Sequence, residues 1–180
     1  DAPTVGSSSA SVSEEGLAGG IQDTAGNPSD TTNAQSVSGT IAISDIDSTP
    51  TITLTAPAEV LTSGGVAVTW TGNGTSASPL VGSASGAEVL RATIDSTGNY
   101  TIILSKAIDH PTGGDENIRS LNIGVTATDP GSPSATATGT IALNIEDDAP
   151  AAVASTRVVT LPAINTNIEL ILDVSGSMGS

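Results

Sequence analysis

The chain has 180 residues, of which 37% are hydrophobic, and it contains neither cysteine nor phenylalanine. Nineteen acidic residues outnumber four basic ones, which gives a formal net charge of −15. The lack of cysteine excludes a disulfide framework, and the lack of a basic stripe excludes nucleic acids and anionic membrane surfaces as expected partners. A core without phenylalanine must consist mainly of Val, Ile, Leu and Ala, which suits thin layers between pleated sheets better than thick helical packing.

The candidate strands are short runs of Val, Ile and Thr, several of which alternate apolar with polar residues. The first 35 residues or so are polar and marginal for folding. Turn-forming sequences such as Gly72-Asn73-Gly74 and Asp129-Pro130-Gly131 separate the runs. No window has a helical period, so we predict an all-β fold, an Ig-like or cadherin-like antiparallel β-sandwich. In chain order the candidate strands are 51–55, 66–71, 88–94, 99–104, 121–127, 140–145 and 157–161.

Two short segments recur in similar form within the chain and indicate tandem modules; we call these recurrences internal echoes. GTIAISDIDSTP at 39–50 returns as GTIALNIEDDAP at 139–150, and the opening Asp-Ala-Pro returns at 148–150. Segments that recur at a fixed spacing are typical of tandem repeats. The acidic tract that ends in proline would then be the junction between two modules. An alternative division has a short N-terminal piece that ends near residue 50 and a compact module of about 100 residues after it. The division we expect is a linker from a preceding repeat at 1–10, a β-sandwich module at 11–147 and a linker at 148–165.

The acidic residues gather at the ends of the predicted strands and at the joints. Asp45 and Asp47 are two positions apart, so in an extended segment both side chains project from the same side. Two such carboxylates repel each other, but they also form part of a ligand set for Ca²⁺, which takes about six to eight oxygen atoms. The alternative interpretation is that the acids cap turns, keep edge strands apart and make the chain soluble.

Most of the chain, from about residue 11 to 150, resembles the tandem repeats of large bacterial type I-secreted adhesins of the RTX class. The segments that carry the resemblance are SEEGLAGGIQD, SDTT, GTIAISDID, VTWTGNG, GNYTIILSKAIDHPTGGDENI, VTATD and IEDDAP. The resemblance implies a β-sandwich extender module that is repeated along a surface fibre and stiffened by Ca²⁺. Such repeats often have a further acid and a glycine after ATD, whereas Pro130 follows Asp129 here, so one ligand of the family pattern is not matched. The calcium ligands that the resemblance implies are Glu15, Asp45, Asp47, Asp109, Glu116, Asp129 and Asp148.

The C-terminal residues, which include IELILDVSGSM, resemble the first strand and metal motif of a von Willebrand factor type A domain. In that family the strand ends in Asp-x-Ser-x-Ser, which Asp173, Ser175 and Ser177 match. The family also takes a Thr and an Asp from later loops, but only three residues follow Ser177. We therefore expect residues 166–180 to be a stray strand with an incomplete cation site, the truncated start of such a domain.

No set of residues indicates an enzyme. The single histidine, His110, lies between an Asp and a Pro and is expected to be a turn residue, and no Gly-x-Ser-x-Gly elbow surrounds a serine. Asp45 and Asp47 could serve glycoside hydrolysis, but a sugar platform usually needs aromatic residues. The chain has only Trp70 and Tyr100, and Trp70 alternates with Val66 and Val68 as a core residue does.

Two classes of function remain open. In the first, the chain is a monomeric, calcium-stabilised spacer of a bacterial cell-surface adhesin, which contacts neighbouring repeats and supports adhesion or biofilm formation. In the second, it is a ligand-binding module of the same adhesin, for carbohydrate or protein. Extracellular modules bind Ca²⁺ at roughly 10⁻⁴ to 10⁻³ M, so the chain is expected to fold outside the cell. The sequence contains no signal peptide and no apolar run long enough to span a membrane, so we expect no membrane insertion.

Overall fold

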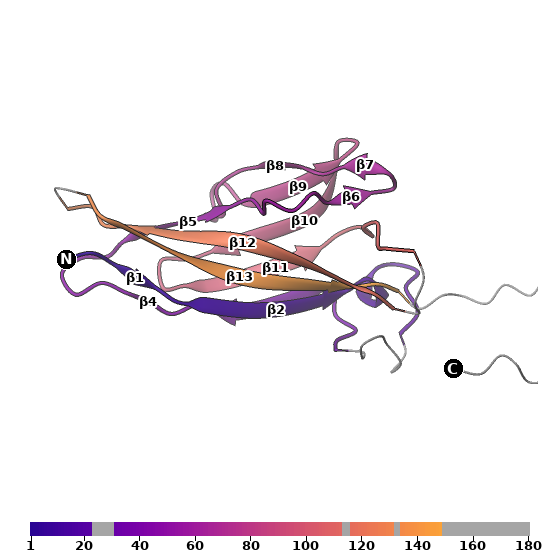
Figure 1. Cartoon of the computed structure of the whole chain (residues 1–180), viewed down its shortest axis with the longest axis horizontal. Helices are drawn as coiled ribbons and strands as arrows, with labels where there is room; N and C mark the ends of the chain where they lie inside the picture. Colours follow the sequence, from indigo (N-terminus) through magenta and orange to yellow (C-terminus); the bar gives the residue numbers. More distant parts are fainter. Residues whose placement is uncertain (23–30, 113–115, 132–133, 149–180) are drawn as a thin grey trace, which may run out of the picture.

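The computed structural model describes residues 1–22, 31–112, 116–131 and 134–148, and these fold into two facing β-sheets with a shared core (Figure 1). The four-stranded sheet has the order β2 (Ser7–Ser13), β13 (Thr136–Glu146), β12 (Ile118–Thr128), β5 (Thr51–Thr55). The five-stranded sheet has the order β3 (Ser36–Thr40), β11 (Asn99–Leu104), β10 (Ala87–Ile94), β9 (Leu80–Ala84), β8 (Thr69–Thr71). The predicted all-β sandwich is therefore confirmed.

Two short ladders and one turn of 3₁₀ helix complete the described structure. The ladders pair β1 (Thr4–Val5) with β4 (Ile43–Ser44), and β6 (Thr62–Ser63) with β7 (Val66–Ala67). The 3₁₀ helix η1 (Glu14–Gly16) directly follows β2. Every strand pair of the described residues is antiparallel except β13 with β2, which run parallel. Within the described part of the chain, no helix is long and apolar enough to cross a membrane.

The core consists of the inward-facing residues of the long strands, as the composition predicts. Leu121, Ile123 and Val125 of β12 lie opposite Leu143, Ile141 and Gly139 of β13, and the apolar members of these pairs are fully buried. Burial of an aliphatic side chain of this size contributes about 1.5–3 kcal/mol. Trp70 was expected in the core, but it is only partly buried, and its ring lies on the edge of the core over Gly82.

Most strand predictions are confirmed, with differences at the edges. Residues 66–71 form two strands rather than one, because β7 pairs with β6 whereas β8 pairs with β9. Between them the backbone N–H of Val68 donates to the carbonyl oxygen of Leu61. The strand expected at 157–161 lies outside the described residues, as do the linker after residue 148 and the stray strand at 166–180.

Residues 1–10 are part of the sandwich and not a linker. They contain β1 and the first residues of β2, and β2 pairs with β13 over its whole length. β3 also precedes residue 50 and pairs with β11. The first 50 residues therefore contribute strands to both sheets, which argues against a separate N-terminal piece.

The sandwich is elongated and has a loop cluster at each end, which we call the N pole and the C pole (Figure 1). The N terminus lies at the N pole, where the loop after β4 meets the end of β12. The end of β13 lies at the C pole together with η1, and the backbone N–H of Asp147 there donates to the carbonyl oxygen of Asn117. The first residue of the chain therefore lies at one pole of the sandwich, and the end of the last described strand lies at the other.

Candidate metal sites at the two poles

The N pole brings together three acids that the sequence predicts as calcium ligands. Asp45 and Asp47 follow β4, and Asp129 follows β12, whose last residue is paired with the first residue of β5. One carboxylate oxygen of each of the three lies within 4.8 Å of the others. We call these three residues the Asp45 cluster. Asp129 belongs to it, and Pro130 directly follows Asp129.

The Asp45 cluster has more acceptors than donors. The Ser48 hydroxyl lies 2.7 Å from Asp45 Oδ2 and 3.0 Å from Asp129 Oδ1, and its single proton can serve only one of them at a time. The backbone N–H of Gly131 donates to the same Asp129 oxygen. Asp45 Oδ1 is buried and has no hydrogen-bond partner among the described residues. A buried acceptor without a donor is costly, and a cation is the partner that this arrangement favours.

The charge and the ligand atoms of the Asp45 cluster both favour a hard cation. Three carboxylates lie close together there, and their mutual repulsion is relieved when a cation binds between them. The ligand atoms that the cluster offers are all oxygen, which is the chemistry that Ca²⁺ prefers.

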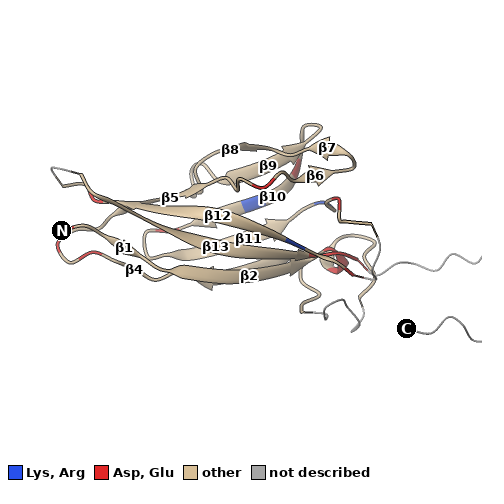
Figure 2. Ribbon diagram, in the orientation of Figure 1, with Lys and Arg blue, Asp and Glu red and all other residues tan. Residues whose placement is uncertain are grey.

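The C pole contains a larger group of acids, which Figure 2 shows gathered around η1 and the end of β13. Glu14, Glu15, Glu116 and Glu146 are all buried. Glu146 accepts hydrogen bonds from the backbone N–H groups of Thr31 and Thr32 and from the Thr31 hydroxyl. It thereby attaches residues 31–32 to the end of β13.

The predicted ligands of the C pole do not share one cluster. Asp148 accepts a hydrogen bond of 2.7 Å from the backbone N–H of Ile21. Ser13 lies beside Glu15, with its Oγ 3.5 Å from a Glu15 carboxylate oxygen. Among the described residues, Glu15, Glu116 and Asp148 do not belong to a group of three ligand atoms within 4.8 Å.

Asp109 is involved in turn structure and not in an acidic cluster of the described residues. Its two carboxylate oxygens accept hydrogen bonds of 2.9 and 2.8 Å from the backbone N–H groups of Gly64 and Gly65, which form the turn between β6 and β7. A hydrogen bond with the Thr62 side chain, followed by these backbone bonds, lowers the pKa of the Asp109 carboxyl. This arrangement matches the alternative interpretation of the acids as turn caps. The remaining predicted ligands, Asp173, Ser175 and Ser177, lie outside the described residues.

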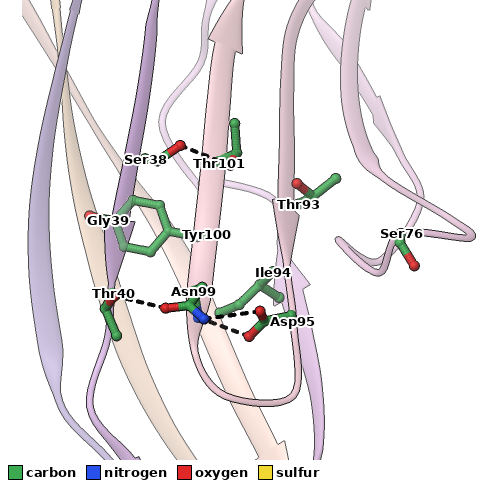
Figure 3. A pocket seen from close by; sticks show the side chains of 10 residues that line it. All are labelled: Ser38, Gly39, Thr40, Ser76, Thr93, Ile94, Asp95, Asn99, Tyr100 and Thr101. Carbon is green, nitrogen blue, oxygen red and sulfur yellow. Dashed lines mark hydrogen bonds between the residues drawn. The ribbon is translucent and has the colours of Figure 1, made fainter.

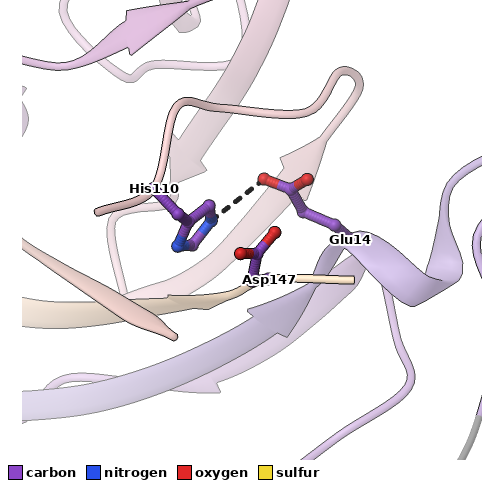
Figure 4. Close-up of side chains that lie close together, drawn as sticks. All are labelled: Glu14, His110 and Asp147. Carbon is purple, nitrogen blue, oxygen red and sulfur yellow. Dashed lines mark hydrogen bonds and ion pairs between the residues drawn. The ribbon is translucent and has the colours of Figure 1, made fainter. Parts of the chain in front are cut away.

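A second cluster was not anticipated from the sequence. Glu14, His110 and Asp147 each offer one ligand atom within 4.8 Å of the other two, and we call them the His110 cluster (Figure 4). His110 Nε2 lies 3.1 Å from Glu14 Oε1, and the same oxygen accepts a hydrogen bond from the backbone N–H of Ile108. The only signal in the sequence was that the single histidine lies in an acidic segment, which does not predict its partners.

A groove of about 550 Å³, most of whose lining residues are polar, lies on the five-stranded sheet next to the turn between β10 and β11 (Figure 3). Asp95 is its acidic residue, but its carboxylate accepts hydrogen bonds from Thr97 and Asn99 of its own turn. Tyr100 also lines the groove, yet only 3% of its surface is exposed. The groove therefore offers neither an unsatisfied acid nor an exposed aromatic ring.

Comparison with known proteins adds no assignment: no protein-family model, no curated protein and no solved structure matches the chain. The sandwich and the chemistry of its two poles are therefore the features that indicate a function.

Proposed function

We propose that the chain is a calcium-stabilised spacer module of a bacterial cell-surface adhesin and that it supports adhesion or biofilm formation. The observation that carries the proposal is the Asp45 cluster. Three carboxylates from two separate loops converge there, and one buried oxygen, Asp45 Oδ1, has no hydrogen-bond partner in the part of the chain that the structure describes. This chemistry fits a hard cation with oxygen ligands, and Ca²⁺ is the ion that takes carboxylates in such a tolerant geometry.

The shape of the sandwich supports a spacer. The chain begins at one pole and the last described strand ends at the other, so copies joined in series would extend along the long axis (Figure 1). Neighbouring repeats of the same chain are then the partners of each module. The internal echoes at 1–3 and 148–150 and at 39–50 and 139–150 favour such a series.

Linkage between binding and folding supplies the mechanism. Without a cation, the clustered carboxylates repel one another and weaken the N pole. An ion that binds only the folded chain stabilises it by about 2.7 kcal/mol when its concentration is a hundred times Kd. Extracellular modules bind Ca²⁺ at roughly 10⁻⁴ to 10⁻³ M. A chain without cysteine would thus gain outside the cell the stability that a disulfide would otherwise supply.

The ligand-binding alternative has less support. Recognition of sugars and proteins usually relies on exposed aromatic residues. The chain has two aromatic residues, of which Tyr100 is buried and Trp70 packs against the edge of the core. The described surface therefore lacks the aromatic platform that such a module would use.

Thermal unfolding in calcium, in magnesium and in EDTA at matched ionic strength tests the proposal. We expect millimolar Ca²⁺, but not Mg²⁺, to raise Tm by about 10 °C for a gain of about 2.7 kcal/mol. Asp45→Asn and Asp129→Asn should reduce this rise, whereas Glu59→Gln, the same chemical change at a distant surface acid, should leave it unchanged. Equal Tm values in calcium and EDTA would overturn the proposal.

A further inference from the structure

We propose that Glu14, His110 and Asp147 form a second metal site, chemically distinct from the Asp45 cluster and suited to a divalent transition ion such as Zn²⁺. This inference does not depend on the calcium proposal, because it concerns the opposite pole and a different class of ion. It assigns a binding role to the chain's single histidine.

The three ligands come from parts of the chain that are far apart in sequence. Glu14 belongs to η1, His110 follows β11 at a distance of 96 residues from Glu14, and Asp147 directly follows β13. Their ligand atoms nevertheless lie within 4.8 Å of one another, and Figure 4 shows the imidazole ring and both carboxylates turned toward a common point. An ion at that point would join the N-terminal segment, the loop after β11 and the end of β13.

One separation already matches that around a transition ion. Zn²⁺ binds nitrogen and carboxylate oxygen at about 2.0–2.2 Å, so the ligands of a tetrahedral ion are about 3.3 Å apart. The distance of 3.1 Å from His110 Nε2 to Glu14 Oε1 is close to this value. The remaining ligand atoms lie within 4.8 Å of one another, so a side-chain movement of at most about 1.5 Å would complete the site.

The burial of the histidine is the second, independent observation. Only 4% of the His110 side chain is exposed, and the buried Nδ1 has no hydrogen-bond partner within the described residues. Glu14 is the one partner of the ring among the described residues. A buried imidazole held by one hydrogen bond is incompletely satisfied. An ion at Nε2 would replace that single hydrogen bond by a coordinate bond, with the ring proton on Nδ1 and the two carboxylates balancing the charge of the ion.

The ligand set also determines the class of ion. One imidazole nitrogen with two carboxylates suits Zn²⁺ and the other first-row divalent ions, whereas Ca²⁺ takes oxygen ligands almost exclusively. The Asp45 cluster offers carboxylates without nitrogen, and the His110 cluster offers both. The two poles should therefore bind different ions at the same time.

Titration of the untagged chain with ZnCl₂ tests the inference, with millimolar CaCl₂ present so that sites with only oxygen ligands are saturated. We expect calorimetry to give one Zn²⁺ per chain and the Zn²⁺ to raise Tm. Asp147→Asn, at a partly exposed residue, should weaken binding at least tenfold, and Asp45→Asn should not. His110→Gln should abolish binding if the variant folds.

Nuclear magnetic resonance of the histidine ring gives a readout that does not depend on any variant. Because the chain has one histidine, its ring nitrogens can be observed without ambiguity. We expect Zn²⁺ to shift the Nε2 resonance strongly and saturably at one equivalent. An unchanged ring spectrum, or equal Zn²⁺ affinity in the wild type and Asp147→Asn, would overturn the inference. A calcium effect on Tm without this shift would contradict the inference and leave the spacer proposal intact.

Discussion

The hydroxyl group of Tyr100 lies 3.0 Å from Oγ of Ser8 and so connects the two sheets, because Tyr100 belongs to β11 and Ser8 to β2. The same hydroxyl lies 3.3 Å from the carbonyl oxygen of Ser9. Gly39, on the neighbouring strand β3, leaves the space that the ring fills. This contact secures the edge of the four-stranded sheet where the only parallel pair of the described residues is found.

Removal of this hydroxyl group should weaken the connection. We expect Tyr100→Phe to lower the free energy of unfolding by about 1–2 kcal/mol, because Ser8 and the Ser9 carbonyl lose a partner in a part-buried position. Urea denaturation measures the change, and a double-mutant cycle with Ser8→Ala gives the coupling energy. Ser38→Ala removes a hydroxyl–hydroxyl contact on the exposed face of the other sheet and should cost less than about 0.5 kcal/mol. Equal effects of the two substitutions would contradict this account.

Two glycines provide a matched test of backbone strain. Gly98 and Gly86 both have a positive φ, of 84° and 76°. A Cβ at Gly98 would collide with the carbonyl oxygen of Ile41, whereas one at Gly86 would meet open space. We expect Gly86→Ala to cost about 1 kcal/mol, from the left-handed conformation alone, and Gly98→Ala to cost at least about 2 kcal/mol, because it adds a steric clash. Chemical denaturation of both variants checks the order, and the reverse order would show that the clash is relieved.

The sequence predicted the parts of the fold in which each strand carries its own pattern. The alternation of Ile, Leu and Val is visible in β12 and β13, because these strands bury large side chains on one face. β2 is Ser-rich, and its two apolar residues, Ala10 and Val12, are both buried. Its alternating pattern is therefore weak, and its position in the sheet depends on pairing with β13. A pairing with a strand more than 120 residues away leaves no local signal.

The candidate sites, like the strands, could be predicted only where the residues concerned are close together in the sequence. Asp45 and Asp47 could be predicted as a pair because they are two residues apart in an extended segment. Asp129 joins them only because β12 ends beside that loop. The resemblance to adhesin repeats names Asp129 as a ligand, but neither it nor the strand pattern predicts that Asp129 lies beside Asp45 and Asp47. The His110 cluster depends on three distant segments, so neither pattern nor spacing could reveal it.

The carboxyl group of Asp95 should titrate far below the usual range. Hydrogen bonds from the side chains of Thr97 and Asn99, together with the backbone N–H of Thr97, lower its pKa to about 2. Because the folded pKa is depressed, the resulting stability is complete above the unfolded value of 3.8 and is lost as the pH falls through about 2. Carboxyl-carbon NMR should give this pKa directly. Thr97→Val removes the largest contribution and should raise the pKa toward 3.8, while an unshifted value in the variant would contradict the assignment.

The carboxylate of Glu146 should stabilise the C pole independently of calcium. Only 2% of its surface is exposed, and the backbone N–H groups of Thr31 and Thr32 both donate to it. We expect Glu146→Gln to lower the free energy of unfolding by about 1.5–3 kcal/mol, because these bonds involve a charged acceptor. Faster hydrogen exchange at both amides should accompany the loss. Glu59→Gln is the control, since Glu59 accepts from Asn122 at the exposed surface.

The effect of calcium on the stability of Glu146→Gln distinguishes a structural carboxylate from a calcium ligand. Glu146 already has its acceptors occupied by residues 31–32, so the destabilisation by Glu146→Gln should be equal in EDTA and in millimolar CaCl₂. Asp45→Asn should behave in the opposite way and cost more in calcium than in EDTA, because Asp45 Oδ1 has no partner within the described chain. A calcium-dependent cost at Glu146 would mean that the ion displaces residues 31–32 and binds at the C pole as well.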